Sequence, residues 1–280
     1  MGYPNPLKTV SRSLTDNIVI TSCGFSCVKV FNFGARMSLI KYGDEIIVWS
    51  PIPYGDEVIK ALNLLTGNSS GVFNIAYLII PNNEHNLAAK SFKANYPNIK
   101  IIALESIDLG LECPIDYRFT KDIGNTLVDQ SVLSEKVGIL SPAILNNLEF
   151  VYLLNSANKD LVMFDKNSKI MFEADILVNL GIPGSTSGKA TLEQYSTLTG
   201  YPDNFLPHFG LSFFTRYLQP YSKVGNWLVS RIANSANPNS QKGLKAIYDW
   251  DFEQIVMCHG NVIDRNAKLT FQNVYQSVLG

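Results

Sequence analysis

The feature that most constrains the fold is a strand–helix–strand unit in the first half of the sequence. Apolar residues dominate the segments 75–80 (IAYLII) and 99–103 (IKIIA), as in buried strands. A polar loop at 82–86 and a helical pattern at 87–96 separate the two segments. A helix between two strands returns the chain to the end at which the first strand began, so that the second strand runs parallel to the first. The sequence therefore predicts an α/β protein.

Short segments rich in β-branched or aromatic residues predict the other strands. They lie at 17–21, 28–33, 37–41, 45–50, 149–154, 160–164, 169–180 and 254–258, with helices expected at 55–67, at 224–233 and up to residue 279. We find no internal repeat and no low-complexity linker. We therefore predict one domain over residues 15–280, preceded by an N-terminal extension of residues 1–14.

Composition excludes several classes of protein. Of the 280 residues 46% are apolar and only 17% are charged, the opposite of a disordered chain. A net charge of −1 gives no electrostatic footprint for nucleic acid or an anionic membrane, so a small molecule is the expected partner. A signal peptide and a long apolar span are absent, and four cysteines are too few for a disulfide scaffold. We expect a cytoplasmic protein with reduced thiols; the oligomeric state stays open.

Three polar side chains are placed where α/β proteins bind ligands. His85 and His259 follow apolar strands, in loops that precede helices, and loops at such strand ends converge on one crevice. Asp175 interrupts an apolar run at 172–178, where an unpaired carboxylate would be costly. Two imidazoles and a carboxylate suit zinc, iron or manganese. Alternatively, each histidine is an ordinary hydrogen-bonded loop residue, and Asp175 pairs with a lysine or caps a helix.

The order of these segments resembles the metallo-β-lactamase-like superfamily. The resemblance covers about residues 15–280 and is carried by the stretches at 49–52 (WSPI), 81–85 (PNNEH), 173–179 (EADILVN) and 258–260 (CHG). It is most similar to an uncharacterised branch of the superfamily, a domain of unknown function. The resemblance implies a four-layer αββα sandwich with a metal site at the edge between the two sheets.

The chain departs from the superfamily signature His-x-His-x-Asp-His. Aligning the last histidine on His85 places Glu84 at the aspartate, Asn82 at the second histidine and Ile80 at the first. A further histidine normally follows the middle strands, but the corresponding loop at 155–158 has none. The first metal position is therefore lost. What the resemblance implies for the second position is the complete ligand set Glu84, His85, Asp175 and His259, with Glu in place of Asp.

This ligand set leads to a specific functional hypothesis. One divalent ion, zinc or iron, would be bound by Glu84, His85, Asp175 and His259, and the protein would hydrolyse a small ester or thioester. Glu84 and Asp175 are the candidate catalytic residues, with Glu84 as general base if it does not bind the ion. The alternative is a non-catalytic member with an eroded metal site that binds a small molecule or a protein. Oxygen chemistry at a single iron is a third possibility.

Four other signals receive structural interpretations. The segment 184–190 (GSTSGKA) lacks the first glycine and the hydroxyl of a phosphate-binding loop, so we expect a flexible loop beside the site. Cys23 and Cys27 have three residues between them, which indicates buried free thiols. His208 is expected to form a loop hydrogen bond or to line the pocket. The aromatic side chains between 205 and 221 are expected to pack a helix onto the core, or else to form a pocket wall or a dimer face.

Overall fold

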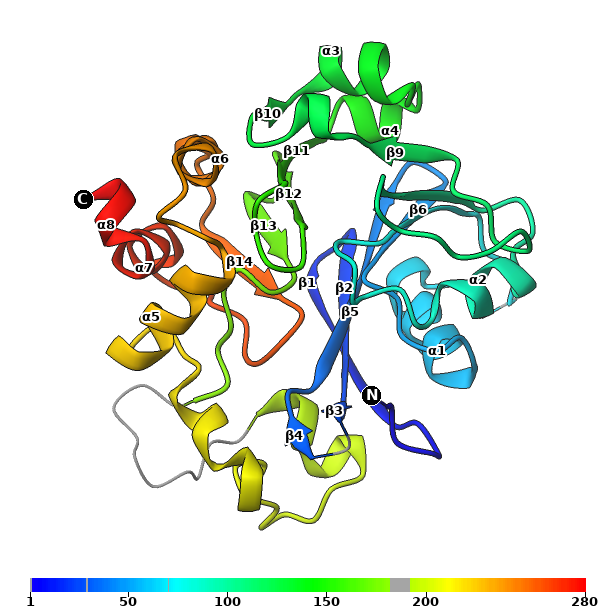
Figure 1. Cartoon of the computed structure of the whole chain (residues 1–280). Helices are drawn as coiled ribbons and strands as arrows, with labels where there is room; N and C mark the ends of the chain where they lie inside the picture. Colours follow the sequence, from blue (N-terminus) through cyan, green and yellow to red (C-terminus); the bar gives the residue numbers. More distant parts are fainter. Residues whose placement is uncertain (1, 29, 70, 182–191) are drawn as a thin grey trace.

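The computed structural model describes residues 2–28, 30–69, 71–181 and 192–280. Two mixed β-sheets face one another between two layers of helices (Figure 1). The larger sheet has the order β1 (Thr9–Thr15), β2 (Ile18–Cys23), β5 (Ala35–Tyr42), β6 (Glu45–Trp49), β7 (Ile75–Ile79), β8 (Lys100–Leu104), β9 (Tyr117–Phe119). The smaller sheet has the order β10 (Leu127–Val128), β11 (Leu148–Leu153), β12 (Asp160–Asp165), β13 (Ile170–Glu173), β14 (Gln254–Met257). The short strands β3 (Ser26–Cys27) and β4 (Phe31–Asn32) form a separate ribbon.

The helices cover the outer faces of both sheets. Helices α1 (Asp56–Thr66) and α2 (Ala89–Asn95) lie on the larger sheet, whereas α6 (Pro238–Asp249), α7 (Ala267–Val274) and α8 (Gln276–Leu279) lie on the smaller one (Figure 1). Further helical segments connect the remaining elements: η1 (Lys121–Ile123), α3 (Gln130–Val132), η2 (Leu133–Val137), α4 (Pro142–Leu145), η3 (Glu193–Tyr195), η4 (Thr197–Thr199), η5 (Gly210–Tyr217) and α5 (Lys223–Ile232).

Side-chain alternation in the smaller sheet explains the layers. In β11, Phe150 and Tyr152 belong to the core between the two sheets, while Val151 and Leu153 belong to the core beneath the outer helices. Successive residues of a strand point to opposite faces, so a strand that is apolar at every position is buried on both sides. Trp49 of β6 and Phe172 of β13 meet in the inter-sheet core, with ring centroids 6.4 Å apart.

The parallel pairing predicted from the strand–helix–strand unit is confirmed. Strands β6, β7, β8 and β9 pair in parallel, and β13 and β14 do so in the second sheet. The predicted αββα architecture is also confirmed. Within each sheet the parallel strands end at the same edge. The candidate site lies where these edges of the two sheets meet.

Three expectations differ from the observed elements. Strand β13 ends at Glu173, so Asp175 lies in the loop beyond it and not inside a strand. Residues 9–14, which we assigned to the N-terminal extension, belong to β1 and pair with β2. The strand predicted at 28–33 is reduced to β4. The segment 184–190, interpreted as a flexible loop, lies outside the described residues.

All four cysteines are free, as expected from their number. Cys23 is fully buried, but Cys27 is only partly buried, so the expectation of two buried thiols holds for one of them. Among the described residues, the helices are too short or too polar to cross a lipid bilayer.

A buried arginine ties the two sheets together behind the site. The Arg36 side chain in β5 is 1% exposed and donates to the carbonyl oxygen of Met257 in β14 at 2.6 Å. It also forms an ion pair with Glu193 at 3.0 Å, and Glu193 in turn pairs with Arg12 of β1. Burial opposes ionisation of Glu193, but the charges of Arg36 and Arg12 outweigh it and hold its pKa below the ordinary value.

We expect Arg36→Met to lower the free energy of unfolding by about 3–5 kcal/mol, because it removes a buried guanidinium and leaves the partly buried Glu193 carboxylate paired with Arg12 alone. Arg12→Met is the matched control, since Arg12 binds the same carboxylate but its side chain is 44% exposed; its cost should stay below about 1 kcal/mol. Urea titrations of both variants measure the difference. Equal losses would contradict the role of Arg36 as a buried link between the sheets.

Candidate metal centre

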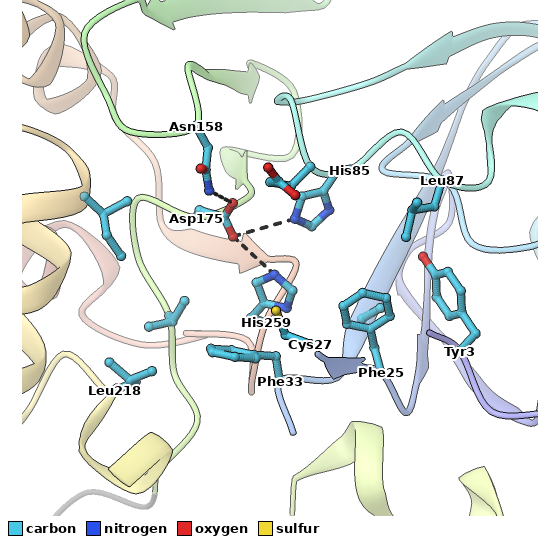
Figure 2. A pocket seen from close by; sticks show the side chains of 14 residues that line it. Tyr3, Phe25, Cys27, Phe33, His85, Leu87, Asn158, Asp175, Leu218 and His259 are labelled. Atoms are coloured by element: carbon cyan, nitrogen blue, oxygen red, sulfur yellow. Dashed lines mark hydrogen bonds and ion pairs between the residues drawn. The ribbon is translucent and has the colours of Figure 1, made fainter. Parts of the chain in front are cut away.

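Three loops at one edge of the two sheets carry the candidate ligands. His85 lies in the loop after β7, Asp175 follows β13, and His259 follows β14. Their side chains point toward one another at the end of the inter-sheet core (Figure 2). The ligand atoms of His85, Asp175 and His259 all lie within 4.8 Å of one another. The sequence thus identified three residues that come together although they are far apart in the chain.

Asp175 is at the centre of this group. Its Oδ1 lies 3.2 Å from Nε2 of His259 and 3.6 Å from Nε2 of His85. Burial disfavours the charged carboxylate, but its contacts with His259 and His85 outweigh burial and hold the pKa of Asp175 well below the ordinary value. Asp175 is therefore ionised at neutral pH, and one of its oxygens faces both imidazoles.

A hydrogen bond to the backbone determines which ring nitrogen of His259 carries the proton and which one presents its lone pair to Asp175. Nδ1 of His259 lies 2.8 Å from the carbonyl oxygen of Gly34, which only accepts hydrogen bonds. Nδ1 therefore carries a proton, and in the neutral ring Nε2 presents a lone pair toward Asp175 Oδ1. Two lone pairs at 3.2 Å repel unless a cation or a second proton lies between them.

A close contact between two loops fixes the position of His259. Gly260 has a φ of +88°, and a Cβ there would lie 2.0 Å from the carbonyl oxygen of Asn179. Only glycine fits this conformation and this approach. The loops are joined by a hydrogen bond from Asn261 N to Asn179 O at 2.9 Å. The glycine of the CHG stretch therefore keeps the loops of Asp175 and His259 side by side.

His85 is held by a strained serine. Oγ of Ser50 lies 3.0 Å from Nδ1 of His85, and Ser50 adopts a φ of 52°, in the left-handed region. Backbone conformations of this kind are uncommon outside glycine and cluster at functional sites. Ser50 follows β6 directly, so the WSPI stretch supports the second imidazole. The sequence analysis used this stretch only as part of the resemblance and missed its contact with His85.

Two side-chain amides donate hydrogen bonds to the second carboxylate oxygen of Asp175, Oδ2. Asn82 Nδ2 donates to Asp175 Oδ2 at 2.6 Å, and Asn158 Nδ2 donates to the same oxygen at 2.7 Å. Asn82 stands at the second histidine of the signature, and Asn158 lies in the loop where a further histidine is expected. Amide N–H groups donate hydrogen bonds and do not bind cations through nitrogen. Two hydrogen bonds therefore occupy this oxygen, at the side where the resemblance implies the first metal position.

A second buried acid lies behind Asn82. Asp160 accepts from Asn82 Nδ2 at 2.9 Å and from Ser156 Oγ at 2.7 Å, and it is fully buried. Burial, followed by the charge of Asp175, raises the pKa of Asp160. Asn82 thus joins two carboxylates through one amide nitrogen, while its oxygen accepts the backbone N–H groups of Glu84 and His85. These contacts explain why asparagine is fixed in this orientation.

The carboxylate inside the strand is Glu173, which the sequence analysis did not select. Glu173 is fully buried, and burial raises its pKa well above the ordinary value. Its Oε2 accepts from the backbone N–H of Leu177 at 3.1 Å. It thereby shapes the turn that carries Asp175. The apolar run at 172–178 contained two acids, and the sequence alone did not say which of them faces the site.

The donor set fits one divalent cation. Ligand atoms about 2.0–2.1 Å from a tetrahedral zinc ion lie about 3.3 Å from one another, and the two distances to Asp175 Oδ1 are 3.2 and 3.6 Å. Two imidazoles and one carboxylate also suit iron(II). The carbonyl oxygen of Gly34 orients the imidazole of His259, and the hydroxyl of Ser50 orients that of His85. Metal-binding histidines are commonly oriented by such a contact at their other ring nitrogen.

The centre opens into a largely apolar cavity of about 310 Å³. Tyr3, Phe25, Phe33, Leu87, Val178, Leu218 and Ile232 line it together with His85, Asp175 and His259. Figure 2 shows the labelled aromatic rings of Phe25, Phe33 and Tyr3 below and beside the imidazoles. Cys27 also lines the cavity, so this thiol is part of the pocket wall.

Glu84 lines the same cavity but does not belong to the group of three converging ligands. Its side chain is exposed, while its backbone N–H binds Asn82. The structure therefore brings together three of the four predicted ligands and leaves the fourth at the rim of the cavity. The proposed exchange of Asp for Glu as a ligand stays a prediction.

No protein-family sequence model matches this chain. No curated protein sequence matches it either. Solved structures do match, among them that of the metallo-β-lactamase DIM-1 exposed to ceftazidime, with 13% identity, 99% coverage of both chains and a TM-score of 0.55. A second is the metallo-β-lactamase FIM-1 from Pseudomonas aeruginosa in its mono-zinc form, with 11% identity, coverage of 97% and 95%, and a TM-score of 0.54.

A third similar structure is a metallo-β-lactamase from Erythrobacter litoralis with β-mercaptoethanol in the active site. It has 11% identity, covers 97% of this chain and 96% of its own, and gives a TM-score of 0.56. These matches over nearly the whole chain show that the protein has the metallo-β-lactamase fold, as the resemblance implied. At such low identities they show the fold alone.

His208 lies outside the metal centre. It is 2% exposed, and its Nδ1 lies 2.8 Å from Oγ1 of Thr215, whose hydroxyl donates to Ser212 O. Of the two expectations for His208, the loop hydrogen bond is therefore confirmed, and His208 is absent from the residues that line the cavity. Burial lowers the pKa of His208 to about 4.

The low pKa of His208 predicts a loss of stability in acid. Because an unfolded histidine titrates near 6.5, the unfolded chain binds more protons between pH 6.5 and 4. The contribution of His208 is complete above pH 6.5 and declines toward pH 4. We expect His208→Gln to flatten this part of the stability curve, measured by urea unfolding at a series of pH values. Parallel curves for the wild type and the variant would contradict the prediction.

Proposed function

We propose that this protein is a hydrolase that uses one divalent metal ion and acts on a small ester or thioester. The observation that carries the proposal is the convergence of Nε2 of His85, Oδ1 of Asp175 and Nε2 of His259 at an apolar cavity. The mono-zinc form of the similar enzyme FIM-1 supports the proposal, because it is a case of this fold with a single zinc ion.

His85, Asp175 and His259 would hold the ion, which we propose to be zinc or iron. When bound, such an ion supplies a Lewis acid for a carbonyl oxygen and lowers the pKa of a water molecule. Gly34 and Ser50 keep the imidazoles oriented, and Asn82 and Asn158 keep Oδ1 of Asp175 facing them. The chain thus supplies a preorganised set of ligands beside a cavity whose wall is mostly apolar.

Glu84 is the proposed general base. It lies on the rim of the cavity, is exposed, and its carboxylate forms no hydrogen bond or ion pair with another described residue. A carboxylate at this place can accept a proton from an attacking water molecule and return it to the leaving alcohol or thiol. Asp175 takes part in catalysis as the anionic ligand that holds the centre together.

The lining of the cavity favours a substrate with an apolar acyl group. Side chains such as Phe25, Phe33 and Leu218 would bury this group, at about 25 cal/mol per Å² of apolar area. The described residues that line the cavity include no lysine or arginine to pair with an anionic substrate. We place this activity in the cytoplasm, in line with the four free cysteines.

A second candidate function is non-catalytic binding of a small molecule. It is favoured by the replacement of the first metal position with the amides of Asn82 and Asn158. In this case the two imidazoles would pair directly with Asp175 Oδ1 and no ion would lie between them. Metal analysis separates the two functions.

We expect about one zinc or iron ion per chain in protein purified without added metal. His85→Ala and His259→Ala should each lower the bound metal at least tenfold, because each removes a nitrogen ligand. His208→Ala is the matched control, since it removes the remaining histidine, and it should keep the metal. Mass spectrometry of the elements measures all four proteins. Undiminished metal in both ligand variants would contradict this centre.

Glu84→Gln tests the general base. The variant should lower kcat for a p-nitrophenyl ester or an acyl thioester by about 10²–10⁴-fold, while the bound metal stays unchanged. Glu112→Gln, at an exposed position far from the cavity, should keep full activity. If the Glu84 variant loses its metal as well, Glu84 is a ligand and not the base. If it keeps full activity, it has neither role.

A further inference from the structure

One stretch of the surface collects the exposed aromatic side chains. Among the described residues, the aromatic side chains that are exposed all lie between 209 and 227: Phe209 (78%), Phe213 (52%), Phe214 (47%), Tyr217 (36%), Tyr221 (50%) and Trp227 (57%). Leu211 and Val224, also exposed, lie between them. These eight residues, which we call the aromatic face, belong to η5, α5 and their connections. Figure 1 shows α5 at the periphery of the molecule.

The core-packing interpretation of this stretch is therefore wrong for most of its aromatic residues. A helix buries one side only, and η5 buries Ser212, Thr215 and Arg216 instead. The side that remains outside is apolar. Soluble proteins rarely expose large apolar groups in one contiguous stretch, and such clusters mark interaction surfaces.

The same stretch carries positive charge without acidic partners. From 204 to 233 the sequence contains Arg216, Lys223 and Arg231, and no aspartate or glutamate. The guanidinium of Arg231 lies 5.3 Å from the Trp227 ring centroid. The net charge of −1 for the whole chain hides this local excess, so it was a poor guide to how this surface interacts.

Arg216 is a buried positive charge beneath the exposed rings of this stretch. It is only 8% exposed, and its Nε and Nη2 have no hydrogen-bond partner among the described residues. Its guanidinium lies 4.9 Å from the ring centroid of Phe213 and 5.9 Å from that of Tyr217. The Arg216 guanidinium therefore packs against these rings from the buried side of η5 and places a positive charge behind the aromatic face.

The aromatic face also adjoins the cavity of the metal centre. Leu218, which follows η5, and Ile232, the last residue of α5, both line the cavity. The two helical segments therefore have an exposed apolar side and, at their ends, side chains that reach the candidate site. A surface bound by this face would lie next to the cavity.

We propose that the aromatic face docks the protein on an anionic lipid bilayer. Tyrosine, tryptophan and phenylalanine next to basic side chains are the composition of segments that lie in the membrane interface. Phosphate groups of lipids would pair with Lys223 and Arg231, which are both exposed, each contributing about fivefold in affinity near an anionic surface. This proposal replaces the expectation that the protein has no membrane partner, and it does not depend on the proposed reaction.

A second copy of the chain fits this face less well. A two-fold dimer would bring the same patch of both copies together. The exposed Lys223 and Arg231 would then lie close to the same basic side chains of the other copy, and the stretch from 204 to 233 offers no carboxylate to pair with them. Like charges placed across an interface oppose association. The charge pattern thus favours an anionic lipid surface.

Co-sedimentation of the full chain with vesicles tests the proposal. We expect binding to vesicles of phosphatidylcholine mixed with phosphatidylglycerol, at least tenfold stronger than to phosphatidylcholine alone, and weakened by salt. Trp227→Ser and Lys223→Glu should each reduce binding about fivefold or more. Leu111→Ser and Lys121→Glu are the controls, since both residues are exposed far from the face, and they should bind as the wild type does.

Urea unfolding tests whether the variants are folded, and light scattering measures the oligomeric state. Each variant should unfold at the same urea concentration as the wild type, because the replaced side chains are exposed. The proposal is overturned if the wild type does not bind anionic vesicles, or if both face variants bind as strongly as the controls. It is also overturned if the wild type is a dimer that Trp227→Ser separates into monomers and no form of it binds vesicles.

Discussion

The candidate site depends on how the two oxygens of the Asp175 carboxylate are divided between the imidazoles and the amides around it. Oδ1 of Asp175 faces two imidazoles, and Oδ2 accepts from two amides. Each oxygen thus has a separate role, because the amides fill one side and leave the other for a cation or protons. If the amides were absent, the carboxylate could rotate, and neither imidazole would have a fixed partner. The loops that bring His85 and His259 to this point matter only because Asp175 is held in this orientation.

Much of the architecture was predictable, because it follows from local patterns. Apolar strands around a helix indicated the parallel pair of β7 and β8, and the positions of His85 and His259 directly after strands indicated loops at strand ends, one from each sheet. Three of the four predicted ligand residues do lie together, and their role as ligands stays a prediction. Strand lengths were less predictable: the apolar run after β13 looked like one strand, yet Glu173 accepts from Leu177 N and turns the chain there.

What the sequence did not reveal are features that depend on long-range contacts. Ser50 and Asn158 are ordinary loop residues in sequence, and only the fold brings them to His85 and Asp175. The aromatic residues after 205 had helical spacing, which does not say whether a face meets the core or the solvent. Charge was summed over the whole chain, and the sum conceals a basic stretch that neighbours an apolar surface.

The two amides also limit what the centre can do. Oδ2 of Asp175 is already bound by Asn82 and Asn158, so Oδ1 alone is left for a cation. The described residues contain a single group of three converging ligands, which suits one ion. A hydrolase built on one ion must find its proton acceptor elsewhere, and among the described residues that line the cavity Glu84 is the other acid beside Asp175. Because positions 80 and 82 and the loop at 155–158 hold no histidine, the role proposed for Glu84 becomes more important.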